Sequence, residues 1–274
     1  MKISEAYRKA AETLSERRGE TLAFLAAEGA LALACLAPLL FLAEKGPIKY
    51  AAALAGVLWL LVMNHARVNA AAAMQDALEG GNLFSLRLAE PEGWKRDILY
   101  GISRTLYLAI WGAPLAAALV YAWDQYAGTT DGLTVLNKIY DFGGKDLKTG
   151  AIYLLLILAG LIALLLVGMA FHSGDRHARA IGEKGLLRGH RMKVLLCRIS
   201  TVVFLLPMIV AAVIAAWRYV PLLNNLNGVV SGDVAKPSTT PTLIILGIGA
   251  VLTVPLLPMR EMVTAAYVNG LRKS

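Results

Sequence analysis

Residues 172–198 read HSGDRHARAIGEKGLLRGHRMKVLLCR and separate two long apolar stretches of the chain. Seven of the 27 Lys and Arg residues lie in this stretch, together with three of the four histidines. Such a density of positive charge between membrane-length apolar segments is typical of a cytoplasmic loop. The stretch therefore predicts a membrane protein and sets the orientation of the segments on either side.

The composition of the whole chain agrees with this prediction. Hydrophobic residues make up 57% of the 274 residues and charged residues 17%, and the mean hydropathy is +0.58. The apolar residues gather in blocks of about 20, the length that a helix needs to cross a bilayer core. The formal net charge of +8 lies in the segments between these blocks. Membrane orientation and contact with anionic lipid explain that charge, so we expect no binding to nucleic acid.

The apolar blocks predict an all-α polytopic bundle of six transmembrane helices in a single membrane domain, residues 1–274. The expected spans are residues 21–43, 50–64, 98–123, 151–171, 199–217 and 242–258. Twenty of the 27 Lys and Arg residues then lie on one side of the membrane. The positive-inside rule assigns that side, with both termini, to the cytoplasm. Residues 124–148 and 219–241 become external loops.

The segment before the first span, residues 1–20, predicts an amphipathic helix. Ile3, Tyr7, Ala10 and Leu14 recur on one face at helical spacing. This helix would lie along the inner membrane surface or, alternatively, pack on a loop. The apolar block that follows is too long for a signal peptide, so we expect it to be retained as a span.

The tripeptide HisAlaArg follows both the second and the fourth expected span, at residues 65–67 and 177–179. Each copy opens a short helix that we expect to end near glycine, at Gly80 and at Gly189. An internal repeat of two spans plus one inner-surface helix would explain this match, and chance similarity is the alternative. Repeats of this kind place a pathway at their interface in many transporters.

Two further patterns concern the later spans. Pro255 and Pro258 predict that the sixth span is kinked or broken. The glycines of the fourth and sixth spans predict close packing against neighbouring helices.

Three segments carry a family resemblance: KISEAYRKAAETL at residues 2–14, EKGLLRGHRMKVLLCRIS at 183–200, and LPMREMVTAAYVNGL at 257–271. Together they resemble a bacterial family of six-helix membrane proteins related to the membrane domain of certain glycerophosphodiester phosphodiesterases. The fourth span reads LAGLIA at residues 158–163, where that family has an apolar stretch with Pro-Gly. The resemblance implies a six-helix membrane fold, and it brings no activity and no catalytic residues.

Two groups of polar residues are candidates for a role inside the membrane. Glu28 is the acidic residue expected within the hydrocarbon of a span, and Arg104 lies at a similar depth in the third span. An intramembrane carboxylate is costly, so we expect these two to pair, with a proton or substrate role for Glu28 as the alternative. Asn64, His65 and Arg67 close the second span and would line an inner vestibule or reach to the membrane interface.

The basic loop is the candidate docking surface for a cytosolic protein or for anionic lipid. The residues expected to make this contact are Arg176, His177, Arg179, Lys184, Arg188, His190, Arg191 and Lys193. His172, Asp175, His177 and His190 also raise the question of a metal site. The many cations of the loop repel a divalent metal, so we expect solvated interfacial residues instead.

Function is predicted from these features and from the motifs that the chain lacks. The sequence has no GxSxG, HExxH, Walker or haem-attachment pattern, and Cys35 and Cys197 stand apart without metal-binding spacing. We expect no enzyme, no cofactor and no metal. The first interpretation is a permease or transport-complex subunit of a bacterial inner membrane, working with a cytosolic nucleotide-binding subunit or as a homo-oligomer. The alternatives are a scaffold or accessory subunit without transport and, third, a lipid-modifying enzyme.

Overall fold

A computed structural model describes residues 1–36, 51, 65–83, 94–126, 132–183, 185–221 and 238–272. All regular structure in these residues is helical, as expected from the apolar blocks. The chain divides into two compact units, which are described separately. Unit 1 comprises Met1–Leu106, Ala170–Phe204 and Val254–Ser274, and unit 2 comprises Tyr107–Met169 and Leu205–Thr253.

Four helical stretches are long and apolar enough to cross a membrane. They are α4 (Trp94–Tyr126), α6 (Leu147–Phe171) with the short α7 (Asp175–Ala180), α8 (Arg191–Ser200) with α9 (Leu206–Trp217), and α12 (Thr239–Thr253) with α13 (Leu257–Arg272). The expected spans 98–123, 151–171, 199–217 and 242–258 fall within these four stretches. The expected span 21–43 is described only as far as α2 (Arg18–Leu36), and span 50–64 lies almost wholly outside the described residues.

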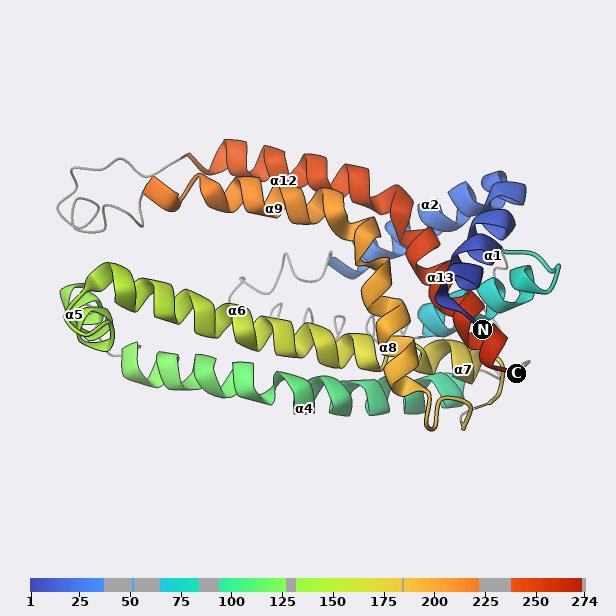
Figure 1. The fold of residues 1–274 in the computed structure, drawn as a ribbon, viewed down its shortest axis with the longest axis horizontal. Coiled ribbons are helices and arrows are strands. Elements are labelled where there is room, and N and C mark those ends of the chain that lie inside the picture. The colour runs from blue at the N-terminus through green and yellow to red at the C-terminus, as the bar shows by residue number, and fades with distance from the viewer. Residues whose placement is uncertain are drawn as a thin grey trace. The chain divides into compact units, whose positions relative to one another are not determined.

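Unit 2 consists mainly of apolar helices that pack through glycine. A Cβ atom added at Gly168 of α6 would collide with the ring of Trp111 on α4, and one at Gly249 of α12 would collide with Ala211 on α9. Figure 1 shows α9 and α12 side by side along their length. The close packing predicted from the glycines is therefore present at Gly168 and Gly249, whereas Gly160 and Gly247 have open space around them.

The segment between α4 and α6, predicted as an external loop, contains a helix that the sequence analysis did not identify. This helix is α5 (Gly132–Phe142). Apolar residues recur along α5 at a helical period, which the Gly-rich and Asp-rich composition of the segment obscures. The chain then turns at Gly144 and Lys145, which both have positive φ, before α6 begins.

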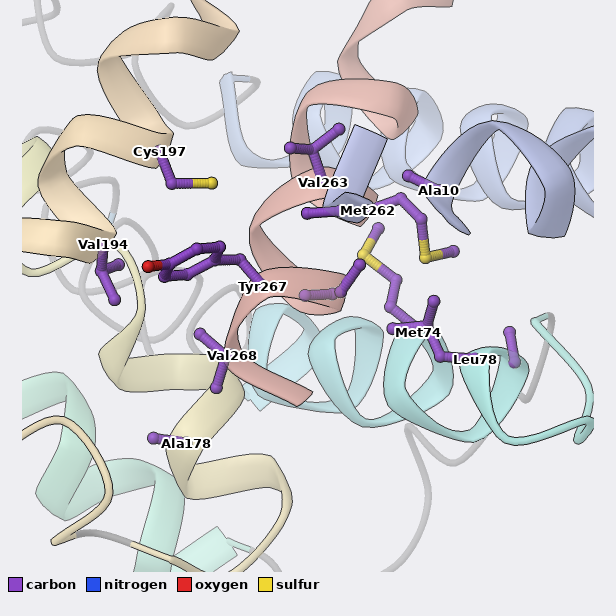
Figure 2. Close-up of a cluster of buried hydrophobic side chains, with 14 of the residues drawn as sticks. Ala10, Met74, Leu78, Ala178, Val194, Cys197, Met262, Val263, Tyr267 and Val268 are labelled. Atoms are coloured by element: carbon purple, nitrogen blue, oxygen red, sulfur yellow. The ribbon is translucent and has the colours of Figure 1, made fainter. Parts of the chain in front are cut away.

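Unit 1 is built around α13. Eight consecutive residues, from Met262 to Asn269, are buried in this helix. Figure 2 shows that α13 is surrounded by α1 (Ile3–Glu16), by the helical residues 65–78 and by the α7–α8 segment. Helix α13 is therefore the centre of the unit 1 core.

Helix α1 explains how the N-terminal segment is held. Its Ala6 and Ala10 are fully buried and form one hydrophobic cluster with residues of α13. The Tyr7 hydroxyl forms a 3.2 Å hydrogen bond with Ser200, and its ring stacks on Phe204. The N-terminal helix is thus packed against α13, and its position along the inner membrane surface stays a prediction.

The predicted helix end at Gly80 and the predicted break at Pro255 are present, whereas α7 ends at Ala180, before Gly182, and not near Gly189 as expected. The helical residues 65–78 stop before Gly80, which has a φ of 94°, and the amide of Gly81 donates to the carbonyl of Asp76 at 2.7 Å. Pro255 lies in a 3-10 turn, η5 (Val254–Leu256), that interrupts the passage from α12 to α13. A second 3-10 turn, η4 (Thr201–Leu205), separates α8 from α9 and was not predicted.

Candidate functional site

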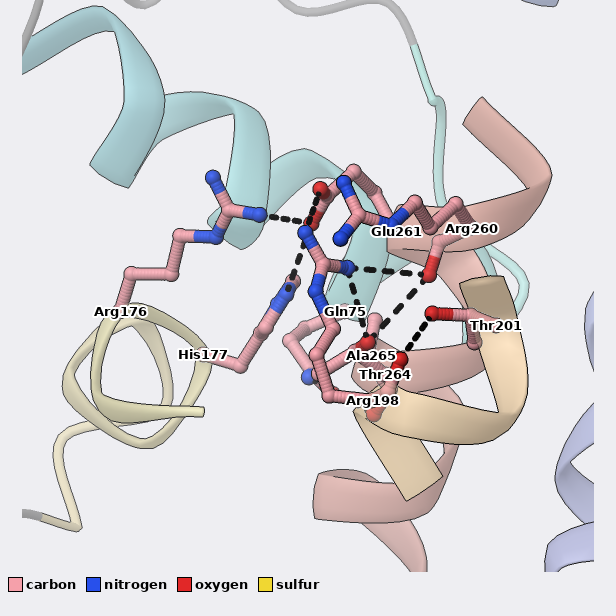
Figure 3. A network of polar contacts seen from close by, with 9 residues as sticks. All are labelled: Gln75, Arg176, His177, Arg198, Thr201, Arg260, Glu261, Thr264 and Ala265. Carbon is pink, nitrogen blue, oxygen red and sulfur yellow. Dashed lines mark hydrogen bonds and ion pairs between the residues drawn. The ribbon is translucent and has the colours of Figure 1, made fainter. Parts of the chain in front are cut away.

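The carboxylate of Glu261 is the centre of a polar network in unit 1, which we call the Glu261 centre (Figure 3). Arg176 of α7 forms an ion pair with Glu261 of α13, and Arg198 of α8 forms a second one at 2.5 Å. The His177 Nε2 atom lies 4.0 Å from the same carboxylate. Two neighbouring helices, α7 and α8, therefore converge with the sequence-distant α13 on a single acidic side chain.

Arg198 makes several bonds within the Glu261 centre besides its ion pair. Its Nη1 atom donates to the backbone carbonyl of Arg260 at 3.3 Å and to the Thr264 hydroxyl at 3.2 Å. The Thr201 hydroxyl donates to the Arg198 carbonyl at 2.7 Å, where α8 gives way to the 3-10 turn. A buried guanidinium requires partners of this kind, because an uncompensated charge would cost several kcal/mol (on the order of 3–5). These bonds fasten α8 to α13.

The charges at the Glu261 centre are unequal. Arg176, Arg198 and Arg260 contribute three guanidinium groups, and Glu261 contributes one carboxylate. Arg176 and Arg260 both act on Arg198 as repelling charges. With His177 neutral, these residues together carry two positive charges in a largely dehydrated place, which makes the centre attractive to an anion.

His177 is fully buried, yet neither of its ring nitrogens has a hydrogen-bond partner among the described residues. The same holds for the Nε atom of Arg260 within that part of the chain. Buried polar atoms usually have partners, so each exception calls for an explanation. Two unpartnered donor-bearing groups next to an excess of positive charge indicate that the Glu261 centre can accept a further acceptor.

His65, which opens the first HisAlaArg tripeptide, has very different surroundings. Its Nδ1 atom lies 2.5 Å from the carboxylate of Asp97, and both side chains are 1% exposed. Its Nε2 atom contacts Asn69 at 3.1 Å, and its ring stacks on Trp94 with centroids 4.2 Å apart. The expected vestibule residue His65 is therefore a fully partnered core residue.

The remaining candidates for the membrane interior are only partly described. Arg104 is half-buried on α4 and lies within electrostatic reach of Arg67 and Tyr100. Arg179 places its guanidinium 5.1 Å from the centre of the Tyr100 ring. Asn64 and the side chain of Glu28 lie outside the described residues, so the Glu28–Arg104 pair stays a prediction.

The expected docking residues divide into inward and outward groups. Arg191 pairs with Asp175 at 3.1 Å and contacts His172 at 2.9 Å, while Arg188 and Lys193 are exposed. Arg176 and His177 belong to the Glu261 centre, His190 is half-buried, and Lys184 lies outside the described residues. The basic loop is thus a folded segment with a few exposed cations.

Contacts with α13 replace the solvation that the sequence analysis expected for this segment. Glu183 forms an ion pair with Arg272 of α13 at 3.0 Å. His177 and Ala178 are buried rather than solvated. Within the described ranges, no three His, Cys, Asp or Glu side chains gather where they could hold a metal ion.

Sequence reasoning missed several residues on and around α13. Glu261, Asp97, Gln75 and Asn269 were not singled out, although each is central to a contact. The Gln75 amide donates to the Ala265 carbonyl at 3.0 Å, and Asn269 donates to Gln75 at 3.0 Å. An acid such as Glu261 within the apolar and small residues of LPMREMVTAAYV was the available signal, because it must find a partner once that helix is buried.

The resemblance to a bacterial six-helix family stays a prediction about this chain. Comparisons with protein families, with curated protein sequences and with solved structures found no match to it.

Proposed function

We propose that the chain is a multi-spanning scaffold or accessory protein of a bacterial inner membrane, and that the inner face of unit 1 binds anionic lipid headgroups. One observation carries the proposal: the basic segment is tied to the buried helix α13, while Arg188 and Lys193 remain exposed. A folded segment loses less conformational entropy on binding than a mobile loop does.

The strength of this interaction follows from the charges. Each Lys or Arg close to an anionic membrane surface contributes about 1 kcal/mol, and the contribution falls off within a Debye length. Two exposed cations on a fixed platform would therefore contribute about 2 kcal/mol by the same rule. Such a modest attraction positions a protein among lipids and does not by itself perform chemistry, which favours a scaffold over an enzyme.

The test compares thermal unfolding in nanodiscs of phosphatidylcholine with unfolding in nanodiscs that also contain phosphatidylglycerol. We expect phosphatidylglycerol to raise the Tm of the wild type and to raise that of Arg188→Gln/Lys193→Gln much less. The control variant, Lys145→Gln/Lys148→Gln, removes two exposed cations from the expected external side. An equal loss in the control would mean a general charge effect and would contradict the proposal.

A transport subunit is the second candidate, supported by the two 3-10 turns within apolar stretches, η4 and η5. Broken helices in transporters expose backbone groups toward a substrate pathway. Cysteines placed at Val251 and Val254 would react with a water-soluble thiol reagent if such a pathway exists. Unreactive cysteines at both positions would leave the interruptions as packing features and would count against transport.

A further inference from the structure

The Glu261 centre has the chemistry of an anion site whose position is held by a carboxylate of the protein itself. Guanidinium groups bind carboxylate and phosphate through the same planar set of N–H donors. Arg176 and Arg198 already bind Glu261 in this manner. An external phosphate group would meet the same donors in the place of Glu261.

The charge and the unpartnered atoms show that one carboxylate does not satisfy this site. Arg176, Arg198 and Arg260 bring three positive charges against the single charge of Glu261. The fully buried His177 keeps both ring nitrogens without a hydrogen-bond partner in the described part of the chain. A phosphate group carries up to two negative charges and more acceptor oxygens than a carboxylate, so it matches this donor set better.

The site is also within reach of a ligand. The side chains of Arg176 and Glu261 are 19% and 20% exposed, whereas that of Arg198 is only 9% exposed. The Glu261 side chain is thus partly exposed although its Oε2 atom is buried, and binding of another anion would require this carboxylate to turn toward solvent. Arg198, fixed by its bonds to the Arg260 carbonyl and Thr264, would stay in place as the inner wall.

We propose that the Glu261 centre binds a phosphate group in competition with Glu261, through Arg176, Arg198 and Arg260, with His177 as a neutral hydrogen-bond donor. The phosphate belongs either to a lipid headgroup or to a soluble phosphate compound. This inference deepens the proposed binding of anionic headgroups and rests on it for the lipid case. It uses a different set of side chains from the exposed Arg188 and Lys193.

The experiment measures the Tm of the full chain in phosphatidylcholine nanodiscs while inorganic phosphate is titrated against sodium chloride of equal ionic strength. Removing the competing charge with Glu261→Gln should lower the phosphate concentration for half-maximal stabilisation roughly tenfold. Adding Arg176→Gln to that variant should reverse the gain. The control Arg188→Gln should change the half-maximal concentration by about twofold or less, as screening of an exposed charge allows.

A second variant covers the case in which Glu261→Gln does not fold. Arg260→Gln removes a half-buried guanidinium whose Nε atom has no hydrogen-bond partner among the described residues, so the fold should tolerate it. The half-maximal phosphate concentration should rise roughly tenfold, as the loss of one charge-assisted contact predicts. Phosphate and chloride acting alike on every variant would overturn the proposal, as would an equal effect of Arg188→Gln.

Nanodiscs with phosphatidic acid separate the two sources of phosphate. Stabilisation by phosphatidic acid without stabilisation by inorganic phosphate assigns the site to a lipid headgroup, and the reverse result assigns it to a soluble compound. Both measurements use the variant Arg188→Gln/Lys193→Gln, so that binding of phosphatidic acid to these two exposed cations does not contribute to the result. The proposed docking surface can therefore fail its own test while the phosphate site stands, and the phosphate site can fail while the docking surface stands.

Discussion

At the scale of single residues, the hydrogen-bond partners of a buried polar side chain decide whether it stabilises the fold. His65 and His177 open the same tripeptide and are both buried, but His65 has a carboxylate at 2.5 Å and His177 has no hydrogen-bond partner among the described residues. Burying a polar group without a partner costs free energy. His65 has its partner and stabilises the fold, whereas His177 marks a place where a ligand could supply the missing hydrogen bond. The difference comes from the neighbours and not from the residue.

Breaking the His65–Asp97 pair should destabilise the protein. Asp97→Ala leaves the buried Nδ1 atom of His65 without a partner, at a cost of about 1–3 kcal/mol. We expect a clearly lower Tm in neutral detergent, measured by tryptophan fluorescence, to which Trp94 on the His65 ring contributes. The matched variant Asp141→Ala removes an exposed carboxylate and should change the Tm little. Equal effects of the two variants would show that the buried pair adds nothing to stability.

Asp146, just before α6, provides a prediction about pH. Hydrogen bonds from the Thr149 hydroxyl, first, and from the Thr149 backbone amide hold the pKa of Asp146 below its usual value. Since the pKa is lowered by folding, the associated stability is present above the unfolded pKa of about 3.9 and is lost as the pH falls through the folded pKa.

Thr149→Val should therefore raise the pKa of Asp146 toward that of an ordinary aspartate. The measurement is a carbon-13 NMR titration of protein labelled at its aspartate carboxyl carbons. Thr240→Val, at an exposed threonine in another helix, should leave the titration unchanged. If Asp146 titrates in Thr149→Val as it does in the wild type, the hydroxyl does not control this carboxylate.

At the scale of helices, small residues decide which faces of the apolar stretches pack. Membrane helices gain little from burying apolar side chains away from lipid, so close contact between backbones through glycine becomes important. Gly249 lies against Ala211 and the backbone of α9, whereas a Cβ atom added at Gly247, two residues earlier, would meet no atom of another element within 4 Å. Helix α12 thus carries one glycine that packs closely against α9 and, two residues away, one that does not.

The two glycines of α12 predict opposite results. Gly249→Ala should destabilise by about 1–3 kcal/mol, because the new methyl group collides with Ala211 and neither backbone can easily move. Gly247→Ala should be neutral or stabilise slightly, since alanine is the better helix former. Thermal unfolding in detergent measures both, and Ala211→Gly should rescue Gly249→Ala. Destabilisation by Gly247→Ala of the same size would contradict the packing of this helix pair.

At the scale of the whole molecule, the two units differ in how much of their apolar surface is buried. Unit 1 holds the buried ion pairs and the hydrophobic cluster around α13, and the helices of unit 2 leave many large apolar side chains exposed. In a membrane protein such exposed side chains face lipid, where they cost nothing. The six-span topology with both termini in the cytoplasm stays a prediction, because it includes residues outside the described ranges.

Cysteine labelling tests the orientation of the molecule. Cys35→Ala provides the background, because the remaining Cys197 is fully buried and should not react. A membrane-impermeant maleimide should label Asn137→Cys on α5 only from outside, and Arg188→Cys only from inside. Both positions are exposed, so access to the reagent is not limited by the fold. Labelling of either position from the opposite side would refute the predicted orientation.

The sequence by itself determined the features that depend on one stretch of chain at a time. The spans at residues 98–123, 151–171, 199–217 and 242–258 were predictable because hydropathy adds up along a single helix. The stop at Gly80 and the interruption at Pro255 were predictable because those residues restrict the local backbone.

Only the tertiary structure decided which polar groups meet. Arg198 and Glu261 are 63 residues apart in the sequence, and the residues around each of them do not indicate that the two side chains form a pair. The burial of α13 likewise requires that three other segments pack around it: α1, residues 65–78 and the α7–α8 segment. An ion pair is a property of two distant sites in a low dielectric, so its existence and strength follow from the folded arrangement alone.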